Sequence, residues 1–448
     1  GLTNLTRYYY RIKSVNSSGV ESGFSNELSA RPNTPPSAPD SLEVINGPHR
    51  VLLSWPVSKS SNVTYKIVRT SVNKPNYMVS GISALGFEDT TLEDGVIYQY
   101  KVCSVDTVGV SSSFTKTKKG RSYRLFFVSA KGRDSVGYGY EFKPMRTIQY
   151  AIDRSRNGDT VLVEKGTYKE NVIFRGKEII LASRFVLGGN KQFIDSTIID
   201  GNTAGCVVRI LNSEGNGTEV SGLVIQNGYA SQGAGFYVSA KKLKINNVIV
   251  RNNLAAGDID GGGGFFWVNT LNINNSVFHN NKGRKGGGIA LVGGDSAWFV
   301  NNEFYDNNGW ECGSSIIFVG GQSQKVFVNN CLIHDEDGAN ALWCQNPTVF
   351  VNNSTIVNNT PNSSGPVVYM NSGAINFNNC IIRNASGKEF QSLVSATPGS
   401  IKLTNCNIRG GYTGTGNFDE DPSFLPNSYR LSNSSTSIGK GNSTSLIK

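Results

Sequence analysis

The feature that most constrains the fold of this chain is an Asn-Asn pair that recurs through its second half. The second Asn of each pair, or a single Asn in the last copy, returns in steps of 23 to 28 residues, at Asn247, Asn275, Asn302, Asn330, Asn353, Asn379 and Asn405. A repeat of this length is typical of solenoids, in which each copy forms one turn of a stacked coil. Each copy holds short β-rich runs between Asn or Gly turns, without a long helical stretch or regularly spaced Leu. The repeat therefore predicts a parallel β-helix rather than a leucine-rich repeat.

The turn residues indicate how such coils would be held. Asn tolerates the left-handed backbone conformation of a tight turn, and its amide can hydrogen-bond to the Asn of the next coil, forming a ladder. Neighbouring coils would lie about 4.8 Å apart, the spacing of paired strands. Glycine clusters predict a second turn with positive φ angles, at Gly233, Gly235, 261–264, 286–288 and Gly313.

The first 120 residues follow a different pattern, in which apolar and polar residues alternate as in half-buried strands. A proline-rich segment at 35–39 precedes a strand that ends in Trp55, and a Tyr-x-Tyr-x-Val strand begins at Tyr98 before a Gly turn. These motifs resemble the fibronectin type III family. The resemblance implies a β-sandwich module over 33–120 and the C-terminal half of a second module over 1–32, both acting as spacers or docking surfaces.

The remainder, 121–448, carries features of the ends as well as the coils of a solenoid. Apolar residues spaced three to four apart predict a capping helix at about 145–155. A Gly-Thr-Tyr motif begins at Gly166, and an Asp-Pro-Ser-Phe motif begins at Asp421. These residues and the coils resemble the right-handed parallel β-helix proteins of the pectin lyase-like superfamily. The resemblance implies an all-β chain with coils at about 160–410 and a C-terminal cap at about 411–448.

Composition excludes several classes of function. The net charge is +10, but no dense Lys/Arg stripe or recognition helix accompanies it, so nucleic acid is not an expected partner. No segment is long and apolar enough for a transmembrane helix. Seven cysteines without CxxC spacing argue against a disulfide framework or a zinc site. The resemblance implies an extracellular or cell-surface location, in a bacterium.

Stacking of coils predicts one polar column. The fourth residue after each ladder Asn gives Arg251, His279, Asp306 and His334 as vertical neighbours. An aspartate between two histidines could orient them or raise their pKa, so these four residues are candidate catalytic residues. Arg284, in the loop after His279, is a fifth candidate, because it could bind a sugar carboxylate.

Two further sets of candidates concern ligands. Trp310 and Trp343 could stack on sugar rings, and Lys285 and Glu311 could contribute polar contacts, which makes these four candidate substrate-binding residues. The segment 334–343 resembles the calcium segment of a pectate lyase family. Ca²⁺ is therefore the one cofactor considered, with none required, and its candidate ligands are Asp306, Asp335 and Asp337.

Two functions stay open, because the superfamily contains both enzymes and adhesins. The first is a non-catalytic scaffold that binds a glycan or another cell-surface component, and that could pair with other subunits through its end coils. The second is a polysaccharide lyase or related enzyme with a groove around Arg251, His279, Asp306, Asp337 and Arg284. The first is favoured, because the resemblance to each enzyme family lacks part of its catalytic motif. A lyase base is missing, since no Lys or Arg lies between Lys325 and Arg383.

Overall fold

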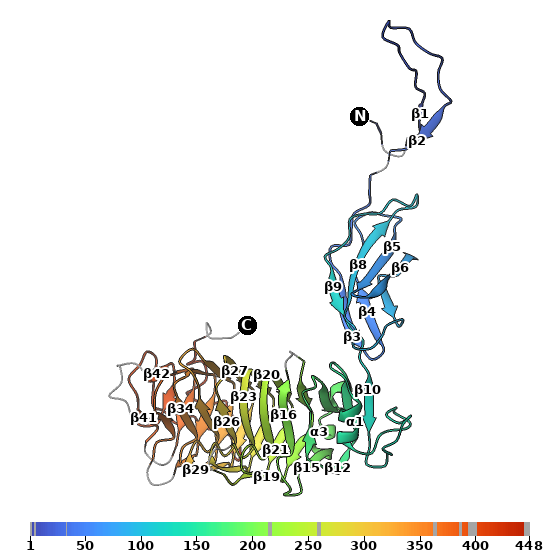
Figure 1. Cartoon of the computed structure of the whole chain (residues 1–448). Coiled ribbons are helices and arrows are strands. Elements are labelled where there is room, and N and C mark those ends of the chain that lie inside the picture. The colour runs from blue at the N-terminus through green and yellow to red at the C-terminus, as the bar shows by residue number, and fades with distance from the viewer. Residues whose placement is uncertain are drawn as a thin grey trace. The chain divides into compact units, whose positions relative to one another are not determined.

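The computed structural model describes residues 2–3, 6–32, 34–213, 217–257, 261–361, 365–384, 388–392 and 401–442. The chain divides into two compact units, Gly1–Arg124 and Leu125–Lys448 (Figure 1). No helix among the described residues has the length and apolar character that crossing a bilayer requires.

The first unit contains an antiparallel hairpin, β1 (Tyr8–Tyr10) with β2 (Leu28–Ala30), and a β-sandwich. One sheet of the sandwich has the order β3 (Glu43–Gly47), β4 (Arg50–Ser54), β7 (Gly86–Asp89). The other has the order β6 (Lys74–Ile82), β5 (Thr64–Ser71), β8 (Tyr98–Val105), β9 (Lys118–Gly120). Trp55, Tyr65 and Tyr100 are buried between the sheets, so alternate residues of these strands form the core.

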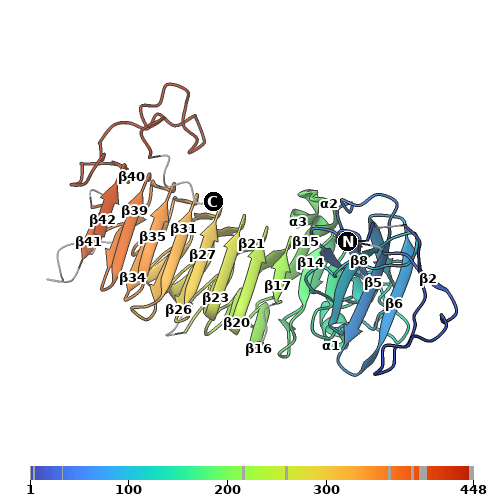
Figure 2. The ribbon, with the colours of Figure 1, turned by 90° about the horizontal axis from the view of Figure 1, so that it is seen from above.

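The second unit is a right-handed parallel β-helix, as the sequence predicts. Most coils contribute two strands to one 18-stranded sheet, here called the large sheet, and two middle coils contribute one long strand each, β20 (Phe236–Asn246) and β23 (Gly264–Asn274) (Figure 2). Its strands are β10 (Leu125–Val128), β11 (Thr160–Val163), β13 (Val172–Ile173), β14 (Ile180–Ser183), β16 (Val208–Ser213), β17 (Glu219–Ser221), β20 (Phe236–Asn246), β23 (Gly264–Asn274), β26 (Ile289–Val292), β27 (Ser296–Val300), β30 (Ile316–Val319), β31 (Lys325–Asn329), β34 (Leu342–Gln345), β35 (Thr348–Asn352), β38 (Val368–Met370), β39 (Ala374–Asn378), β41 (Phe390–Ser392) and β42 (Ile401–Thr404).

A third strand of each coil enters a ten-stranded sheet. Its strands are β12 (Gly166–Lys169), β15 (Thr197–Asp200), β18 (Val224–Gln226), β21 (Ile249–Arg251), β24 (Val277–His279), β28 (Glu303–Tyr305), β32 (Leu332–His334), β36 (Thr355–Val357), β40 (Ile381–Arg383) and β43 (Asn407–Ile408). Middle coils add short strands on the remaining side, in two small sheets formed by β19 (Tyr229–Ala230), β22 (Leu254–Ala255), β25 (Lys282–Lys285) and β29 (Asn308–Cys312), and by β33 (Asp337–Gly338) and β37 (Thr360–Pro361).

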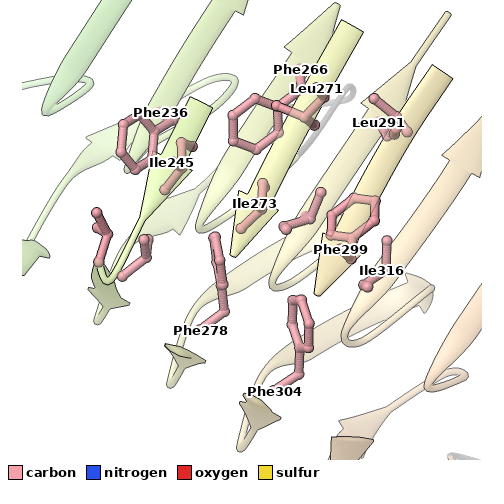
Figure 3. Packing of buried hydrophobic residues seen from close by; sticks show 14 of the residues in the cluster. Phe236, Ile245, Phe266, Leu271, Ile273, Phe278, Leu291, Phe299, Phe304 and Ile316 are labelled. Atoms are coloured by element: carbon pink, nitrogen blue, oxygen red, sulfur yellow. The ribbon is translucent and has the colours of Figure 1, made fainter. Parts of the chain in front are cut away.

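The core is a column of apolar side chains inside the coils. Successive coils stack like residues on one another, as Figure 3 shows for Phe278 and Phe304, whose ring centroids lie 5.3 Å apart. Phe236 and Phe266 repeat this contact on the large sheet, at 6.0 Å. One core cluster extends from Val128 to Ile408, so burial of apolar surface is continuous along the whole β-helix.

The predicted capping helix is α1 (Ile148–Arg154). Thr147 accepts a hydrogen bond from the Tyr150 amide, and Ile148, Ala151 and Ile152 are buried against the first coil. The carboxylate of Glu170 accepts from the backbone amides of Ile148 and Gln149, at 2.9 Å each, which satisfies donors at the helix start. Two short helices that the sequence does not predict, α2 (Phe185–Gly188) and α3 (Gln192–Ser196), lie between β14 and β15.

The Asn turn is displaced by one residue in one coil. Six of the seven expected ladder residues have φ between 50° and 54°, but the prediction is wrong at Asn302, because Asn301 takes the left-handed position with φ 57°. Strand pairing places Val300 beside Asn329, so Asn301 lies next to Asn330, and Asn330 Nδ2 donates to Asn301 Oδ1 at 2.6 Å. Asn302 instead points inward, is 2% exposed, and donates to the Ile273 carbonyl at 2.8 Å.

The glycine clusters serve two purposes. Gly233, Gly261, Gly286 and Gly313 have positive φ angles, as expected of a turn. Gly263 has an ordinary φ, but a Cβ at this residue would lie 2.4 Å from the Gly288 carbonyl oxygen of the next coil. The clusters therefore also permit close backbone approach between coils.

Candidate functional site

The predicted polar column exists on the ten-stranded sheet, with one member replaced. Parallel pairing aligns Arg251 with His279, His279 with Tyr305, and Tyr305 with His334. Asp306 is therefore not in the column. It follows Tyr305 in a turn with φ 52° and is exposed. It was predicted in the column because the turn of this coil lies at Asn301, one residue earlier than the position expected from the Asn-Asn pairs.

The middle of this column is a stack of rings. His279 lies 4.7 Å from Tyr305 with ring planes 9° apart, and Tyr305 lies 5.2 Å from His334 with planes 18° apart. Burial, together with the charge of Arg251, lowers the pKa of His279. Arg251 Nε itself donates to Gln226 Oε1 at 2.9 Å.

His334 is held between two carboxylates. Its Nδ1 lies 2.6 Å from Asp335 Oδ2, and its Nε2 lies 3.0 Å from Glu303 Oε1. Burial opposes protonation, but the hydrogen bonds to Glu303 and Asp335 outweigh it and raise the pKa of His334. Both ring nitrogens are thus used within the protein, so His334 is placed as a structural anchor rather than as a proton donor to a ligand.

The anchor fixes the C-terminal segment, residues 411–442. The Tyr429 hydroxyl lies 3.0 Å from both oxygens of Asp335, and its ring lies 4.7 Å from that of His334. Earlier in the segment, Asp419 forms an ion pair with Arg383 at 2.6 Å. Tyr429 and Arg430 close one side of a polar groove of about 860 Å³ over the Asn turns, here called the tail groove.

Removing the Tyr429 hydroxyl is expected to loosen this segment. Y429F deletes a hydrogen bond to a charged acceptor, which is worth about 1.5–3 kcal/mol. Proteases should then cleave within 411–442 faster than in the wild type, while Y412F, in the same segment, should leave the rate unchanged. Equal cleavage of wild type and Y429F would contradict the anchoring role.

The same anchor predicts a pH range for docking of the segment. Desolvation opposes ionisation of Asp335, but the hydrogen bonds from His334, Asn358 and Tyr429 outweigh it and lower its pKa below 3.8, so its contribution is lost as pH falls through that lowered value. The pKa of His334 is raised above 6.5, so its contribution is complete below 6.5 and is lost as pH rises through the raised value. Protection of the amides of 411–442 from hydrogen exchange, relative to the intrinsic exchange rate at each pH, should therefore be greatest between about pH 4 and 6.5.

A second groove, here called the aromatic groove, lies over the first strands that each coil gives to the large sheet. Strand pairing aligns Ala290, Ile317, Trp343 and Tyr369, one per coil, on the outward face. Trp343 and Tyr369 stack with centroids 6.3 Å apart and planes 11° apart. Trp310 of β29 lines the wall and is 49% exposed. The groove has a volume of about 840 Å³.

All four predicted substrate-binding residues, Lys285, Trp310, Glu311 and Trp343, line this groove. The sequence prediction did not include its apolar floor. The floor alternates with inward residues such as Leu291 and Phe318, a period-2 pattern that could have identified it. The remaining lining residues are Ala290, Val292, Cys312, Ile317, Val319, Ala339, Asn340, Gln345, Gly365, Pro366, Tyr369 and Asn371.

The charges of the aromatic groove lie at its rim and contact one another. Arg284 hydrogen-bonds to Glu311, and Lys285 Nζ lies 3.4 Å from Glu311 Oε1. Although desolvation opposes it, the contact with Arg284 and the charge of Lys285 lower the pKa of Glu311. Arg284, expected as a catalytic residue, therefore holds an ionised carboxylate in place.

The composite groove expected around Arg251, His279, Asp306, Asp337 and Arg284 is not formed. Arg251 and His279 lie on the ten-stranded sheet, whereas Arg284 lies on β25 beside the aromatic groove. Asp337 is exposed on β33. The prediction failed because these residues lie on different sheets, and therefore on different sides, of the β-helix.

Two of the predicted metal ligands, Asp306 and Asp335, are neighbours in adjacent coils, since each follows a residue of the pair Tyr305–His334. Within the described ranges, no three His, Cys, Asp or Glu side chains gather as they would around a metal ion. Both oxygens of Asp335 already accept hydrogen bonds, from His334, Asn358 and Tyr429. Calcium binding by Asp306, Asp335 and Asp337 stays a prediction.

No protein-family model and no curated protein matches this chain. Among solved structures, an Fn3-like protein from Clostridium thermocellum is similar over 20% of this chain and 98% of its own, at 20% identity and a TM-score of 0.18. The pectin methylesterase PemA from Erwinia chrysanthemi is similar over 66% of this chain and 92% of its own, at 11% identity and a TM-score of 0.32. A family 28 exopolygalacturonase from Yersinia enterocolitica is similar over 83% and 92%, at 13% identity and a TM-score of 0.24. At these identities the similarities concern the fold alone.

Proposed function

We propose that the β-helix binds a polysaccharide chain in the aromatic groove and does not cleave it. The observation that carries this proposal is the gathering of Trp310, Trp343 and Tyr369 in one groove of about 840 Å³. Half-exposed aromatic faces favour contact with flat, partly apolar groups such as sugar rings. Asn340, Gln345 and Asn371 line the same groove and offer amide donors and acceptors for hydroxyl groups.

The carboxylates of the groove support binding rather than hydrolysis. Glycoside hydrolysis generally needs two carboxyl groups, one of them a proton donor. Among the described lining residues, Glu311 is the one carboxylate, and Arg284 and Lys285 favour its ionised form. It is therefore poorly suited to donate a proton to a leaving group.

The proposal extends to the location and to the first unit. Binding of polysaccharide is a task for the cell surface or the extracellular space, which is where the sequence resemblance places such proteins. The β-sandwich of the first unit then acts as a spacer of the fibronectin type III kind, and the rigid coils present the groove.

Loss of a groove tryptophan is expected to weaken glycan binding. W310A should lower the affinity for a bound polysaccharide roughly tenfold, because an aromatic contact of this kind is worth about 1 kcal/mol or more. Calorimetric titration measures the effect. W267A is the matched control, since Trp267 is 61% exposed and does not line the groove. Equal losses in both variants would contradict a specific site.

The alternative function, a polysaccharide lyase, is tested on the same samples. A lyase produces unsaturated sugars that absorb ultraviolet light, and the proposal expects none from any polysaccharide tested. Release of such products by the wild type but not by H279A or R251A would replace the binding function with catalysis on the ten-stranded sheet.

A further inference from the structure

The aromatic groove has a charge distribution that distinguishes between classes of glycan. Its charged side chains are Lys285 and Glu311, with Arg284 behind them, and both cations contact the same carboxylate. The other described lining residues are uncharged. The charge of each cation is therefore partly offset by Glu311, although both keep further N–H donors.

The floor of the groove is apolar over several coils. Phe265, Ala290, Cys312 and Ile317 form a buried cluster outside the core, and Val292, Val319 and Trp343 pack against it. Placing a sugar carboxylate on such a floor would remove part of its water and leave it only the neutral amide donors of Asn340, Gln345 and Asn371 as partners near the floor.

The orientation of a ligand follows from the strand register. Ala290, Ile317, Trp343 and Tyr369 occupy successive coils in one column, with about 4.8 Å between neighbouring strands. A linear chain that contacts all four must lie across the strands, parallel to the axis of the β-helix. Its sugar rings then meet the aromatic side chains, while its hydroxyl groups reach the rim.

We infer that the aromatic groove selects a neutral, linear glycan that lies along the axis of the β-helix, with Glu311 as an acceptor for its hydroxyl groups. This inference rests on the proposed function. Glu311 acts here as a specificity-determining residue, since a carboxylate accepts hydroxyl hydrogen bonds strongly. Arg284 and Lys285 hold it in position and together more than balance its charge.

The experiment compares two probes of equal length, a neutral β-linked glucan hexasaccharide and an acidic oligogalacturonate hexasaccharide. Wild type is expected to bind the neutral probe, with an affinity that does not change between low and high salt. E311Q should weaken the neutral probe and strengthen the acidic probe, each by roughly tenfold, because Arg284 and Lys285 then lack their carboxylate. Glu311 is exposed at the rim, and thermal unfolding of the variant checks that it folds.

The outcomes separate the two proposals. Tighter binding of the acidic probe by wild type, falling with salt, would overturn the neutral selectivity while leaving glycan binding intact. Binding of neither probe, or binding that W310A does not weaken, would overturn the proposed function itself. Binding of an apolar peptide instead of either probe would identify the groove as a peptide site and would overturn both.

Discussion

Replacing Glu336 with Gln is expected to abolish most of the loss of stability that the β-helix undergoes as pH rises from about 4.5 to 8. Glu336 is 1% exposed inside the coils, where Oε1 accepts from Asn307 at 3.0 Å. Among the described residues, none forms a hydrogen bond with its Oε2. Burial raises the pKa of this carboxyl to about 8 from an ordinary value of 4.5, so the folded protein holds a proton that the unfolded chain releases.

The sign of the effect follows from proton linkage. Between pH 4.5 and 8 the folded state binds one proton more than the unfolded state, so the free energy of unfolding falls as pH rises. Each pH unit is worth about 1.4 kcal/mol per proton, so the full loss is on the order of 5 kcal/mol. A Gln at this position is neutral at every pH, and the loss should disappear.

Denaturant unfolding of wild type and E336Q, repeated from pH 5 to 9, measures the prediction. The variant should become the more stable protein toward the alkaline end. E420Q is the control, because Glu420 is exposed on the C-terminal segment. Parallel pH profiles for wild type and E336Q would show that Glu336 is not protonated in the folded state.

The second large effect concerns a buried ladder of asparagines. Asn281 is fully buried, and its Nδ2 donates to the Val250 carbonyl at 2.9 Å and to Asn307 Oδ1 at 3.0 Å. Its Oδ1 accepts from the backbone and side-chain nitrogens of Asn253, at 3.2 and 2.9 Å. N281A deletes all four bonds and leaves buried partners unsatisfied.

Each buried group left without a partner costs about 1–3 kcal/mol, so N281A is expected to destabilise the β-helix by roughly 3–5 kcal/mol. Thermal or denaturant unfolding measures the change. The matched control is N272A, at a half-buried residue on the outward face of β23, which should cost less than about 1 kcal/mol. A loss for N281A no larger than for N272A would show that the ladder contributes little.

The sequence predicts the coils well because the Asn residues of their turns recur with the period of the coil. Asn247 and Asn275 need left-handed backbone, and few residues other than Gly tolerate it. The same property misplaced one coil, since the pair Asn301–Asn302 offers two residues for one turn, and only strand pairing decides between them. The error at Asp306 follows directly from that choice.

The buried ladder of Asn253, Asn281 and Asn307 was not predicted, although a second asparagine follows most of the turns. Polar residues are rarely expected inside a core, so the pattern does not by itself identify them as buried. The anchor between Asp335 and Tyr429 is even harder to predict from the sequence. These residues are 94 positions apart, and the C-terminal segment has no period that links it to a coil.

The sequence predicted four of the residues that line the aromatic groove, but not that they come together in one groove. Trp310, Trp343, Lys285 and Glu311 could be named because large aromatic and charged residues are conspicuous among Asn and Gly. Their convergence depends on which face of β34 and β29 turns outward, and this follows from register. The polar column was the reverse case. Arg251 and His279 are neighbours as predicted, but His279 stacks on Tyr305 and His334 is held by Asp335.

The fixed coil spacing places equivalent side chains at equal intervals along the axis of the β-helix. Because each lap adds one residue to the column that includes Ile317 and Trp343, positions along the axis are quantised in increments of about 4.8 Å. A polymer whose own subunit length is commensurate with that increment meets equivalent surroundings at every step. Duplicating or deleting an entire lap would then change the number of such steps by a whole unit, without altering the chemistry at any one of them.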